Sequence, residues 1–313
     1  MSAAAAMLVA LIVDALVGWP AAIYARIGHP VTWIGAMIGA LDRSWNRSSA
    51  SDLARRAAGA LAASCVIGAA AGTAWCVAAI LPEGWAGVML TGILAWPLLA
   101  VRSMHDHVAE VAKPLAAGDL AAARLAVSMI VGRDPSVLEP PDVARAALES
   151  LAENTSDGIM APLFWGVIFG LPGIAGYKAV NTLDSMIGHR TPRHEAFGWA
   201  AARIDDLANL LPARATGLLF ALVSGRPAPA LAAMLRDAHR HRSPNAGWPE
   251  AAMAGGLGVR LSGPRIYGGR MSNEPWLNGS APDPDHRDVM RGLAIYRRAM
   301  AVTAILLLVL VMV

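Results

Sequence analysis

Three carboxylates at four-residue intervals are the first residues of this sequence whose spacing suggests chemistry. Glu149, Glu153 and Asp157 lie in an Ala- and Leu-rich stretch that follows Pro140 and that Gly158 can end. Four-residue steps place side chains on one helix face. Carboxylates so placed repel one another. A Mg²⁺ ion held by one or two of them together with a substrate phosphate would offset this repulsion. The alternative is an acidic helix face that is exposed to solvent. We take Glu149 and Glu153 as catalytic candidates, and Glu153 and Asp157 as candidate metal ligands.

A second polar segment, residues 181–209, gathers amide, carboxylate, imidazole and guanidinium groups beside an apolar stretch. Charged groups next to a bilayer segment are costly and are therefore functional candidates, although a structural salt-bridge network is the alternative. Asp205 and Asn209 share a helix face at four-residue spacing, and we expect Asp206 to pair with Arg203. The candidates here are Asp184 and His189 as catalytic residues, Asp184 and Asp205 as metal ligands, and Asn181, Arg190 and Asn209 as substrate-binding residues.

A third polar segment, residues 236–250, combines arginines and histidines with glycine and proline. Arginines and free backbone N–H groups suit phosphate recognition. We take His239 as an acid–base candidate, although a lone histidine is more often a plain hydrogen-bonding residue. The sequence contains no nucleotide loop of the GxxxxGK type, so it does not locate an ATP site. The remaining candidate phosphate- and substrate-binding residues are Arg133, Asn154, Arg236, Arg242, Ser243, Asn245 and Trp248.

The elements that position these residues must lie in a membrane. The 313-residue chain is 56% hydrophobic and 16% charged, with a mean hydropathy of +0.46 and a net charge of +3. An ordinary soluble domain is about 45–50% apolar and about 25% charged. The composition therefore argues against a soluble domain and against a disordered chain. We expect an all-α, polytopic integral membrane protein whose residues 1–313 form one membrane-embedded catalytic domain.

Uncharged or nearly uncharged stretches define about four full spans, because roughly 20 apolar residues cross a bilayer. Prolines and glycines interrupt a fifth stretch and one arginine a sixth, so these are re-entrant or spanning helices, and we favour the re-entrant alternative. Arginines concentrate between the first two spans, which by the positive-inside rule places that loop and the active-site loops in the cytoplasm and the protein in the inner cell membrane. The expected spans are 3–25, 57–81, 85–101 and 296–313, the broken helices 159–177 and 207–225, and the polar active-site loops 102–158, 178–206 and 226–270.

Ordered polar motifs run along nearly the whole chain. The motifs are DALVGWP at 14–20, HPVTWIG at 29–35, GRDPS at 132–136, ESLAENTSDG at 149–158, NTLDSMIGH at 181–189, RIDDLAN at 203–209, SPNAGWPE at 243–250 and GP at 263–264. Taken together, these motifs resemble the CobD/CbiB family, the membrane-bound adenosylcobinamide-phosphate synthases of cobalamin biosynthesis, and a set of ordered motifs over about 250 residues is very specific. Nothing in 273–286 matches, so we expect that segment to be a peripheral loop.

The family resemblance implies a ligase that joins a propionate carboxylate of adenosylcobyric acid to (R)-1-amino-2-propanol or its O-phosphate through an amide. It also implies ATP and Mg²⁺, with an acyl phosphate as the activated form. The expected partners are the corrinoid, the aminopropanol compound and membrane lipid, with no nucleic acid. Association with other late membrane enzymes of the pathway and a homo-oligomer are further expectations.

Two rival functions stay open on the residues alone. A membrane phosphotransferase or prenyltransferase also uses carboxylates at the bilayer edge to bind Mg²⁺ and pyrophosphate, but its aspartates fall in one continuous run. Here the carboxylates are scattered over three segments, and only Asp157-Gly158 matches in part. A corrinoid-binding protein without catalysis is the other rival, and it predicts binding without ATP consumption.

Overall fold

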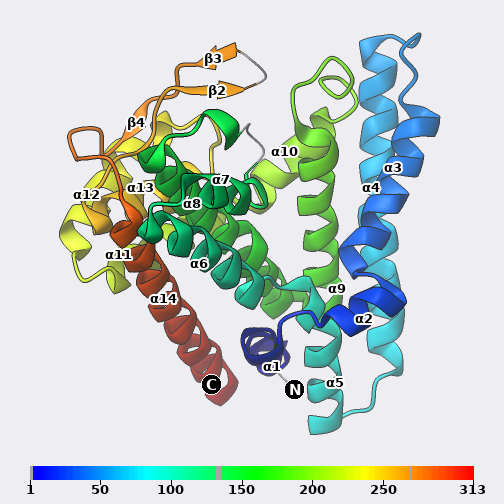
Figure 1. Ribbon diagram of the computed structural model, residues 1–313. Helices are drawn as coiled ribbons and strands as arrows, with labels where there is room; N and C mark the ends of the chain where they lie inside the picture. Colours follow the sequence, from blue (N-terminus) through cyan, green and yellow to red (C-terminus); the bar gives the residue numbers. More distant parts are fainter. Residues whose placement is uncertain (1–2, 132–134, 268–269) are drawn as a thin grey trace. The chain divides into compact units, whose positions relative to one another are not determined.

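The fold is that of an all-α membrane protein, as the sequence predicts. The structure is a computed structural model, which describes residues 3–131, 135–267 and 270–313. Within those residues, β-structure is confined to two short antiparallel pairs (Figure 1). These pairs are β1 (Leu261–Ser262) with β4 (Trp276–Leu277), and β2 (Arg265–Tyr267) with β3 (Arg270–Ser272).

The described residues include four helical segments that are long and apolar enough to cross a membrane, by length and composition alone. Two bent helix pairs raise the number to as many as six. The predicted span 3–25 is not one straight helix, because the chain bends by 109° after Val17, where Gly18 has a positive φ of 63° and Pro20 precedes the next helix. The four segments are Asp52–Ile80, Trp85–Ala117, Pro140–Gly188 and His286–Met312, and the bent pairs are Ala3–Val17 with Ala21–Trp45 and Trp199–Ala208 with Leu210–Val223.

The chain divides into two compact units, and each combines segments that are distant in sequence. Unit 1 consists of the described parts of Met1–Ala100, Ala161–Asn209 and Ala304–Val313. Its helices and turns are α1 (Ala3–Val17), α2 (Ala21–Ile27), α3 (Pro30–Trp45), α4 (Asp52–Ile80), α5 (Trp85–Ala95), the 3₁₀ turn η1 (Trp96–Leu98), α9 (Ala161–Leu183), the π-helical turn η4 (Asp184–Gly188), α10 (Trp199–Ala208) and the end of α14 (His286–Met312).

The core of unit 1 forms where α3, α4, α9 and α10 pack together. Small residues let these helices approach closely, which is the usual basis of helix association in membranes. Gly59 of α4 is such a residue, since an added Cβ would lie 1.8 Å from the carbonyl oxygen of Phe197. The buried members of this core are Ile38, Ala62, Ala63, Val66, Ala179, Leu183, Ile187, Phe197 and Ala201.

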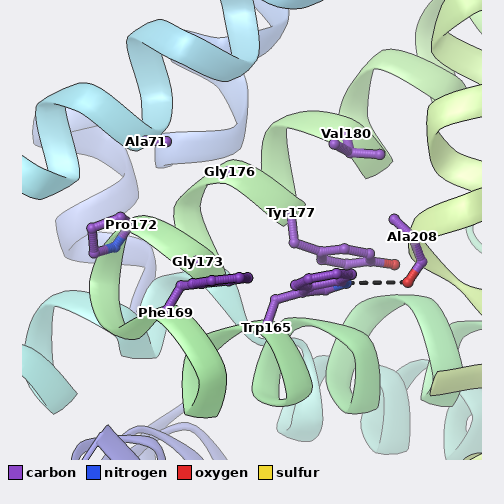
Figure 2. Close-up of a pocket in the computed structure, with 9 residues that line it drawn as sticks. All are labelled: Ala71, Trp165, Phe169, Pro172, Gly173, Gly176, Tyr177, Val180 and Ala208. Carbon is purple, nitrogen blue, oxygen red and sulfur yellow. Dashed lines mark hydrogen bonds between the residues drawn. The ribbon is translucent and has the colours of Figure 1, made fainter. Parts of the chain in front are cut away.

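Helix α9 contains a kink inside the stretch that the sequence marked as broken. Gly170 has φ 66° and ψ −147°, and Pro172 follows it. A proline inside a helix removes one hydrogen bond and clashes with the preceding turn, so a kink is expected. On the near side of the kink, the indole N–H of Trp165 donates to the carbonyl oxygen of Ala208, 3.1 Å away (Figure 2).

Unit 2 consists of the described parts of Val101–Met160 and Leu210–Thr303. Two of the segments predicted as polar loops, 102–158 and 226–270, are largely helical here. Helix α6 shows the reason, because Val101, Met104, Val108 and Val111 recur at helical spacing and are all buried. The helices and turns of unit 2 are α6 (Val101–Ala117), α7 (Leu120–Ser128), the 3₁₀ turn η2 (Pro135–Val137), α8 (Pro140–Thr155), the π-helical turn η3 (Ser156–Met160), α11 (Leu210–Val223), α12 (Pro227–Asp237), the 3₁₀ turn η5 (Ala238–Arg240), α13 (Gly247–Leu257) and most of α14.

The segment 273–286 is an integrated part of unit 2, which corrects the prediction of a peripheral loop. Asp283 accepts hydrogen bonds of 2.8 and 2.6 Å from Arg260 and also pairs with Arg145, whose side chain is only 8% exposed. Both guanidinium groups lie over the ring of Trp276, at 4.8 Å for Arg145 and 4.3 Å for Arg260. The hydrogen bonds from Arg260, and then the charge of Arg145, hold the pKa of the Asp283 carboxyl below its ordinary value despite partial burial.

Candidate functional site

Two π-helical turns coincide with the two Asn-Thr-x-Asp motifs of the sequence. The first turn, Ser156–Met160, follows Asn154-Thr155, and the second, Asp184–Gly188, follows Asn181-Thr182-Leu183. In both, the threonine hydroxyl donates to the carbonyl four residues earlier, at 2.6 Å for Thr155 and 2.7 Å for Thr182. Single π-turns inside α-helices occur often at functional sites. Each unit therefore contains one such element, with an aspartate within it.

The first π-turn and the burial of α8 change the predicted row of three carboxylates. Glu149 is buried at 6% exposure, and its Oε1 accepts a 2.7 Å hydrogen bond from the backbone N–H of Ser262. Glu153 is exposed and Asp157 is half-buried. The expectation that Gly158 ends the helix is wrong, because α8 passes directly into the π-turn. The three carboxylates thus occupy different environments, and Glu149 has a structural hydrogen bond in addition to its predicted catalytic role.

A buried series of hydrogen bonds in unit 1 ends at Asp205, one of the candidate metal ligands. Asn209 is fully buried, donates from Nδ2 to Asp205 Oδ2 at 3.0 Å, and accepts at Oδ1 from the hydroxyl of Tyr177 at 2.8 Å. This confirms that Asp205 and Asn209 share a helix face. Both ends of the Asn209 amide are bonded within the protein, so Asn209 holds the Asp205 side chain in place, and its contact with substrate stays a prediction.

Asp184 belongs to a polar cluster at the second π-turn. Its half-buried carboxylate folds over Gly188, where an added Cβ would lie 2.0 Å from Asp184 Oδ1, so only glycine leaves room for it. Electrostatic interactions connect Asp184 with His189 and Asp206. Asp206 pairs with Arg203 at 2.9 Å, which confirms that prediction. His189 and Arg190 are exposed at the end of the turn, and Arg190 interacts electrostatically with Asp206. The structure therefore brings the candidates Asp184, His189 and Arg190 together.

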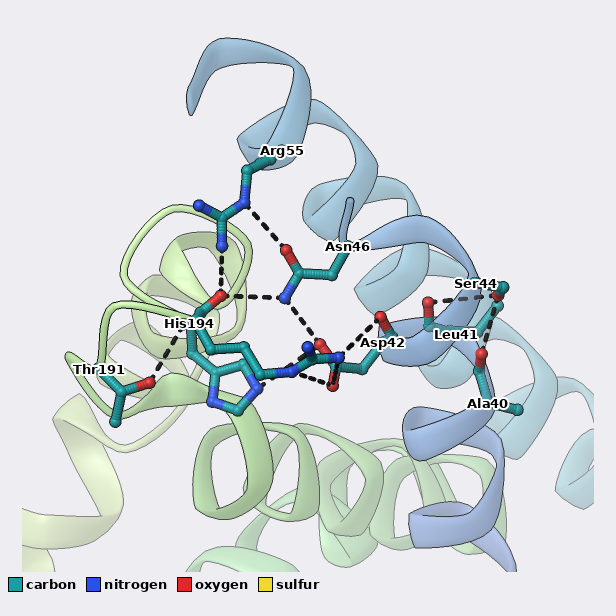
Figure 3. A network of polar contacts seen from close by, with 9 residues as sticks. Ala40, Leu41, Asp42, Ser44, Asn46, Arg55, Thr191 and His194 are labelled. Atoms are coloured by element: carbon teal, nitrogen blue, oxygen red, sulfur yellow. Dashed lines mark hydrogen bonds and ion pairs between the residues drawn. The ribbon is translucent and has the colours of Figure 1, made fainter. Parts of the chain in front are cut away.

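The loop that follows this cluster is fastened by a polar network that the sequence reasoning missed. Arg193 donates to Asp42 Oδ2 at 3.0 and 2.7 Å, and Asn46 donates to Asp42 Oδ1 at 2.8 Å (Figure 3). The carbonyl oxygen of Arg193 accepts from Asn46 at 3.0 Å and from Arg55. The four-residue spacing of Asp42 and Asn46 was a signal for a shared face, but their partner is 151 positions away from Asp42.

In unit 2, two nearby histidines, His239 and His241, lie in different environments. His239 is exposed, whereas His241 and Glu250 have side chains only 6% and 3% exposed, with Nε2 and Oε1 3.8 Å apart. The backbone N–H of Ser243 donates to His241 Nδ1 at 3.1 Å, which favours the tautomer with its proton on Nε2, and the Ser243 carbonyl oxygen lies 3.4 Å from the same Nδ1. A histidine oriented by a carboxylate is a common acid–base arrangement. The sequence signal for His241 was its place in the polar segment 236–250.

Several predicted phosphate-binding residues of unit 2 bind other parts of the protein. Arg236 pairs with Asp237 at 2.7 Å, as Arg240 does at 3.6 Å. Burial alone would raise the pKa of the Asp237 carboxyl, but the hydrogen bonds from Arg236 and from the backbone N–H of Asn278 lower it below its ordinary value. Both arginines still line a cavity of about 500 Å³, with Asp237, Pro275, Trp276, Gly279 and Ser280.

Most of the remaining side chains predicted to bind substrate or phosphate lie at or near the start of α13. The Ser243 hydroxyl accepts from the backbone N–H groups of Asn245 and Ala246, both at 3.2 Å, which caps this turn. Asn245 is buried, and Arg214 lies 4.5 Å from the ring of Trp248. Arg242 pairs with Glu274 at 3.8 Å. Arg133 lies outside the described residues.

Metal ligands are the least defined part of the site. Among the described residues, no three His, Cys, Asp or Glu side chains are gathered as metal ligands would be. Mg²⁺ needs only one or two carboxylates when phosphate and water complete its shell. Unit 1 holds Asn181, Asp184, His189, Arg190, Asp205 and Asn209, and unit 2 holds Glu149, Glu153, Asn154, Asp157, Arg236, His239, Arg242, Ser243, Asn245 and Trp248. The expectation that these two groups form one site stays a prediction.

Comparison with known proteins supplies the family. A family model described as CobD/CbiB protein matches residues 7–296. A protein of Rhodobacter capsulatus named cobalamin biosynthesis protein CobD is 68% identical over 301 residues, which cover 96% of this chain and 95% of the relative. Proteins of the same name from a Sinorhizobium species and from Brucella suis are 46% and 44% identical, and cover 94% and 93% of this chain and 94% and 92% of their own lengths. No solved structure matches the chain significantly.

Proposed function

Because this chain belongs to the CobD/CbiB family, we propose that it acts in cobalamin biosynthesis as an amide-forming ligase. In this proposal, a propionate carboxylate of adenosylcobyric acid is joined to (R)-1-amino-2-propanol or its O-phosphate, which gives adenosylcobinamide or its phosphate. The observation that carries the proposal is the match over residues 7–296, together with the name shared by the relatives. This match includes the polar segments in which all the candidate residues lie.

The reaction requires activation, because an amide does not form from a free carboxylate and an ammonium group in water without an energy source. The propionate oxygen attacks the γ-phosphorus of ATP, and ADP leaves. The ammonium group loses one proton to solvent and becomes the neutral amine, which attacks the acyl carbon. Phosphate leaves, and a second proton passes from nitrogen to a base. The protein must therefore hold two anions close together, keep water away and accept one proton.

The residues divide into three proposed functions. His241, with Glu250 behind it, is the leading base for the amine proton, and His189 and His239 are further acid–base candidates. Arginines neutralise the phosphate groups, and the cavity next to Arg236 and Arg240 offers two exposed guanidinium groups for this. The other proposed binding residues are Arg133, Asn154, Asn181, Arg190, Arg242, Asn245 and Trp248.

The carboxylates fit Mg²⁺ in the form that it takes with nucleotides. Oxygen ligands suit this ion. Because Gly188 has no side chain, there is room beside it for the Asp184 carboxylate. Asp184 and Asp205 in unit 1, and Glu153 and Asp157 in unit 2, are the proposed ligands. Mg²⁺ would offset the negative charge of the transferring phosphoryl group. Asn209 holds Asp205 in place for this purpose.

We further propose that the polar segments face the cytoplasm and that the protein resides in the inner membrane. Four apolar helical segments support a membrane location, and the arginine-rich loop after the first apolar stretch supports the sidedness. Single cysteines introduced at Glu83 and at Asp285, in a variant from which Cys65 and Cys76 are removed, test it by labelling with a membrane-impermeant maleimide. The proposal requires labelling of the Glu83 position from outside intact spheroplasts and of the Asp285 position only after lysis.

The test of the reaction uses the detergent-purified full chain with adenosylcobyric acid, ATP, Mg²⁺ and either aminopropanol or its phosphate. Mass spectrometry follows the amide product while each component is omitted in turn. The proposal requires product that depends on both ATP and Mg²⁺. Corrinoid binding without product or ATP consumption would identify a non-catalytic corrinoid-binding protein instead, and transfer of a phosphoryl or prenyl group would identify the other rival function.

Two conservative variants test the carboxylates. Asp184→Asn and Glu153→Gln should each reduce kcat by at least about 10²-fold, because a proposed ligand of Mg²⁺ would lose its charge. Asp52→Asn and Glu83→Gln are matched controls on exposed carboxylates. Near-normal turnover in both test variants would remove these residues from the proposed mechanism.

A further inference from the structure

An apolar cavity of about 420 Å³ lies within unit 1, where α4, α9 and α10 meet. Figure 2 shows the aromatic side chains of its wall, which project from α9. A volume of this size is in the range of ligand-binding cavities. Its lining consists of Ala71, Trp165, Phe169, Pro172, Gly173, Gly176, Tyr177, Val180 and Ala208.

The chemistry of the wall excludes a polar or charged ligand. No charged side chain lines the cavity. The polar side-chain groups of the wall are bonded elsewhere, since Trp165 Nε1 donates to the Ala208 carbonyl oxygen at 3.1 Å and the Tyr177 hydroxyl donates to Asn209 at 2.8 Å. A ligand with amide, phosphate or ribose groups would lose its hydration here without replacement, which is costly. A hydrocarbon would lose nothing.

Glycines and one proline create this space. An added Cβ at Gly173 would lie 2.1 Å from the Trp165 carbonyl oxygen, so only glycine allows the chain to fold back here after the kink at Gly170. Before the kink, Trp165 and Phe169 lie four residues apart on one helix, and their rings stack with centroids 5.8 Å apart at an interplanar angle of 8°. The result is a flat aromatic wall, against which a flexible chain of methylene groups can pack.

The position of the cavity identifies the source of such a chain. Apart from Ala208, its lining residues belong to Asp52–Ile80 and to Pro140–Gly188, both long and apolar enough to cross a membrane. Phe169 is 60% exposed, so the lining reaches the outer surface of these helices. We infer that this cavity binds one acyl chain of a membrane phospholipid. Neither the proposed ligase reaction nor the substrates of that reaction enter this inference.

Photo-crosslinking in lipid nanodiscs tests the acyl-chain site. The probe is a phosphatidylethanolamine that carries a diazirine in the middle of one acyl chain, and peptide mass spectrometry maps the labelled residues. We expect labelling to concentrate on the α9 segment that contains Trp165, Phe169 and Tyr177. Excess unlabelled phosphatidylethanolamine should compete for this labelling. Even labelling of all lipid-facing helices would overturn the inference.

A filled-cavity variant and a matched control complete the test. Gly176→Leu places a side chain in the cavity, where the nearest atom to its Cβ is that of Ala71 at 3.5 Å, whereas Gly72→Leu places the same side chain where nothing lies within 4 Å. Labelling of the cavity should fall about ten-fold in the first variant and stay unchanged in the second, a loss of about 1.4 kcal/mol in binding free energy. Equal labelling in both variants would overturn the inference.

If Gly176→Leu does not fold, competition experiments on the unaltered protein test the acyl-chain site. Competition by a diazirine-free phospholipid supports the site, while labelling that only a free fatty acid or the solubilising detergent displaces would overturn the assignment to phospholipid. Because ligase activity is not measured, failure here leaves the proposed reaction untouched. Likewise, loss of the proposed reaction would not change the labelling pattern.

Discussion

Replacement of Asn209 should weaken both the stability of unit 1 and the turnover of the enzyme. The side chain is fully buried and joins Asp205 to the hydroxyl of Tyr177. Asn209→Ala removes the donor from a carboxylate and the acceptor from a hydroxyl. A hydrogen bond to a charged group is worth about 1.5–3 kcal/mol, and one between neutral groups in a membrane about 0.6–1.7 kcal/mol. We therefore expect a loss of roughly 3 kcal/mol.

Tyr177→Phe is the informative partner of this variant, because it deletes only the second hydrogen bond. On its own it should cost about 1 kcal/mol. In the double variant, the hydrogen bond between Tyr177 and Asn209 is already absent through either change, so the total should stay near 3 kcal/mol rather than reach about 4 kcal/mol. The coupling free energy is then about 1 kcal/mol in magnitude.

Unfolding by a graded denaturing detergent, followed by circular dichroism, measures these differences. Turnover measured on the same samples should fall about 10–100-fold for Asn209→Ala, as is typical when the partner of a metal ligand is lost. It should fall less for Tyr177→Phe. Additive free energies of unfolding in the double variant, or unchanged turnover in Asn209→Ala, would refute the reasoning that the hydrogen bonds from Tyr177 through Asn209 position Asp205.

Three further predictions concern other parts of the molecule. Gly59→Ala should destabilise the protein by about 3 kcal/mol or more in the same unfolding assay, because its Cβ would lie 1.8 Å from a carbonyl oxygen, whereas Gly68→Ala on the same helix meets open space and should change stability by about 1 kcal/mol or less. The folded-state pKa of Asp283 is lowered, so its ion pairs stabilise fully above the unfolded pKa of about 4, and this contribution is lost as the pH falls through the folded pKa; in thermal scans at decreasing pH, Asp283→Asn should lower the unfolding temperature at pH 7 and flatten its decrease in acid. His241→Gln should reduce kcat about 10²-fold, and His239→Gln less; a larger effect at His239 would reverse this assignment.

Local spacing predicted those features of the site that depend on one helix. Asp205 with Asn209 and Arg203 with Asp206 lie three or four residues apart, and both pairs form as expected. A hydropathy window, in contrast, averages over Gly18 and misses the bend there, although a glycine next to a Trp-Pro pair is a recognisable break. The broken helix at 159–177 was predictable because its glycines and prolines are more numerous.

Features that depend on distant partners were not accessible from the sequence. Glu149 fits an acidic row by spacing, yet its hydrogen-bond partner Ser262 is 113 positions away and directs it inward. Asp157 lies within the π-turn Ser156–Met160, where the α-helical geometry that the four-residue spacing assumes does not apply. The choice between His239 and His241 likewise depends on burial beside Glu250, and no local periodicity expresses it.

The division of the chain into interleaved segments has a consequence for its biosynthesis. Unit 1 contains residues from the first, third and last parts of the chain, and the segments of unit 2 are translated between them. A ribosome therefore completes Leu210–Thr303 of unit 2 before it makes Ala304–Val313, the last portion of unit 1. Early helices must wait in the translocon or the bilayer, partly unpacked, until later ones arrive. No single cut in the chain separates the two units, so when the protein is expressed as two fragments at least one fragment contains segments of both units.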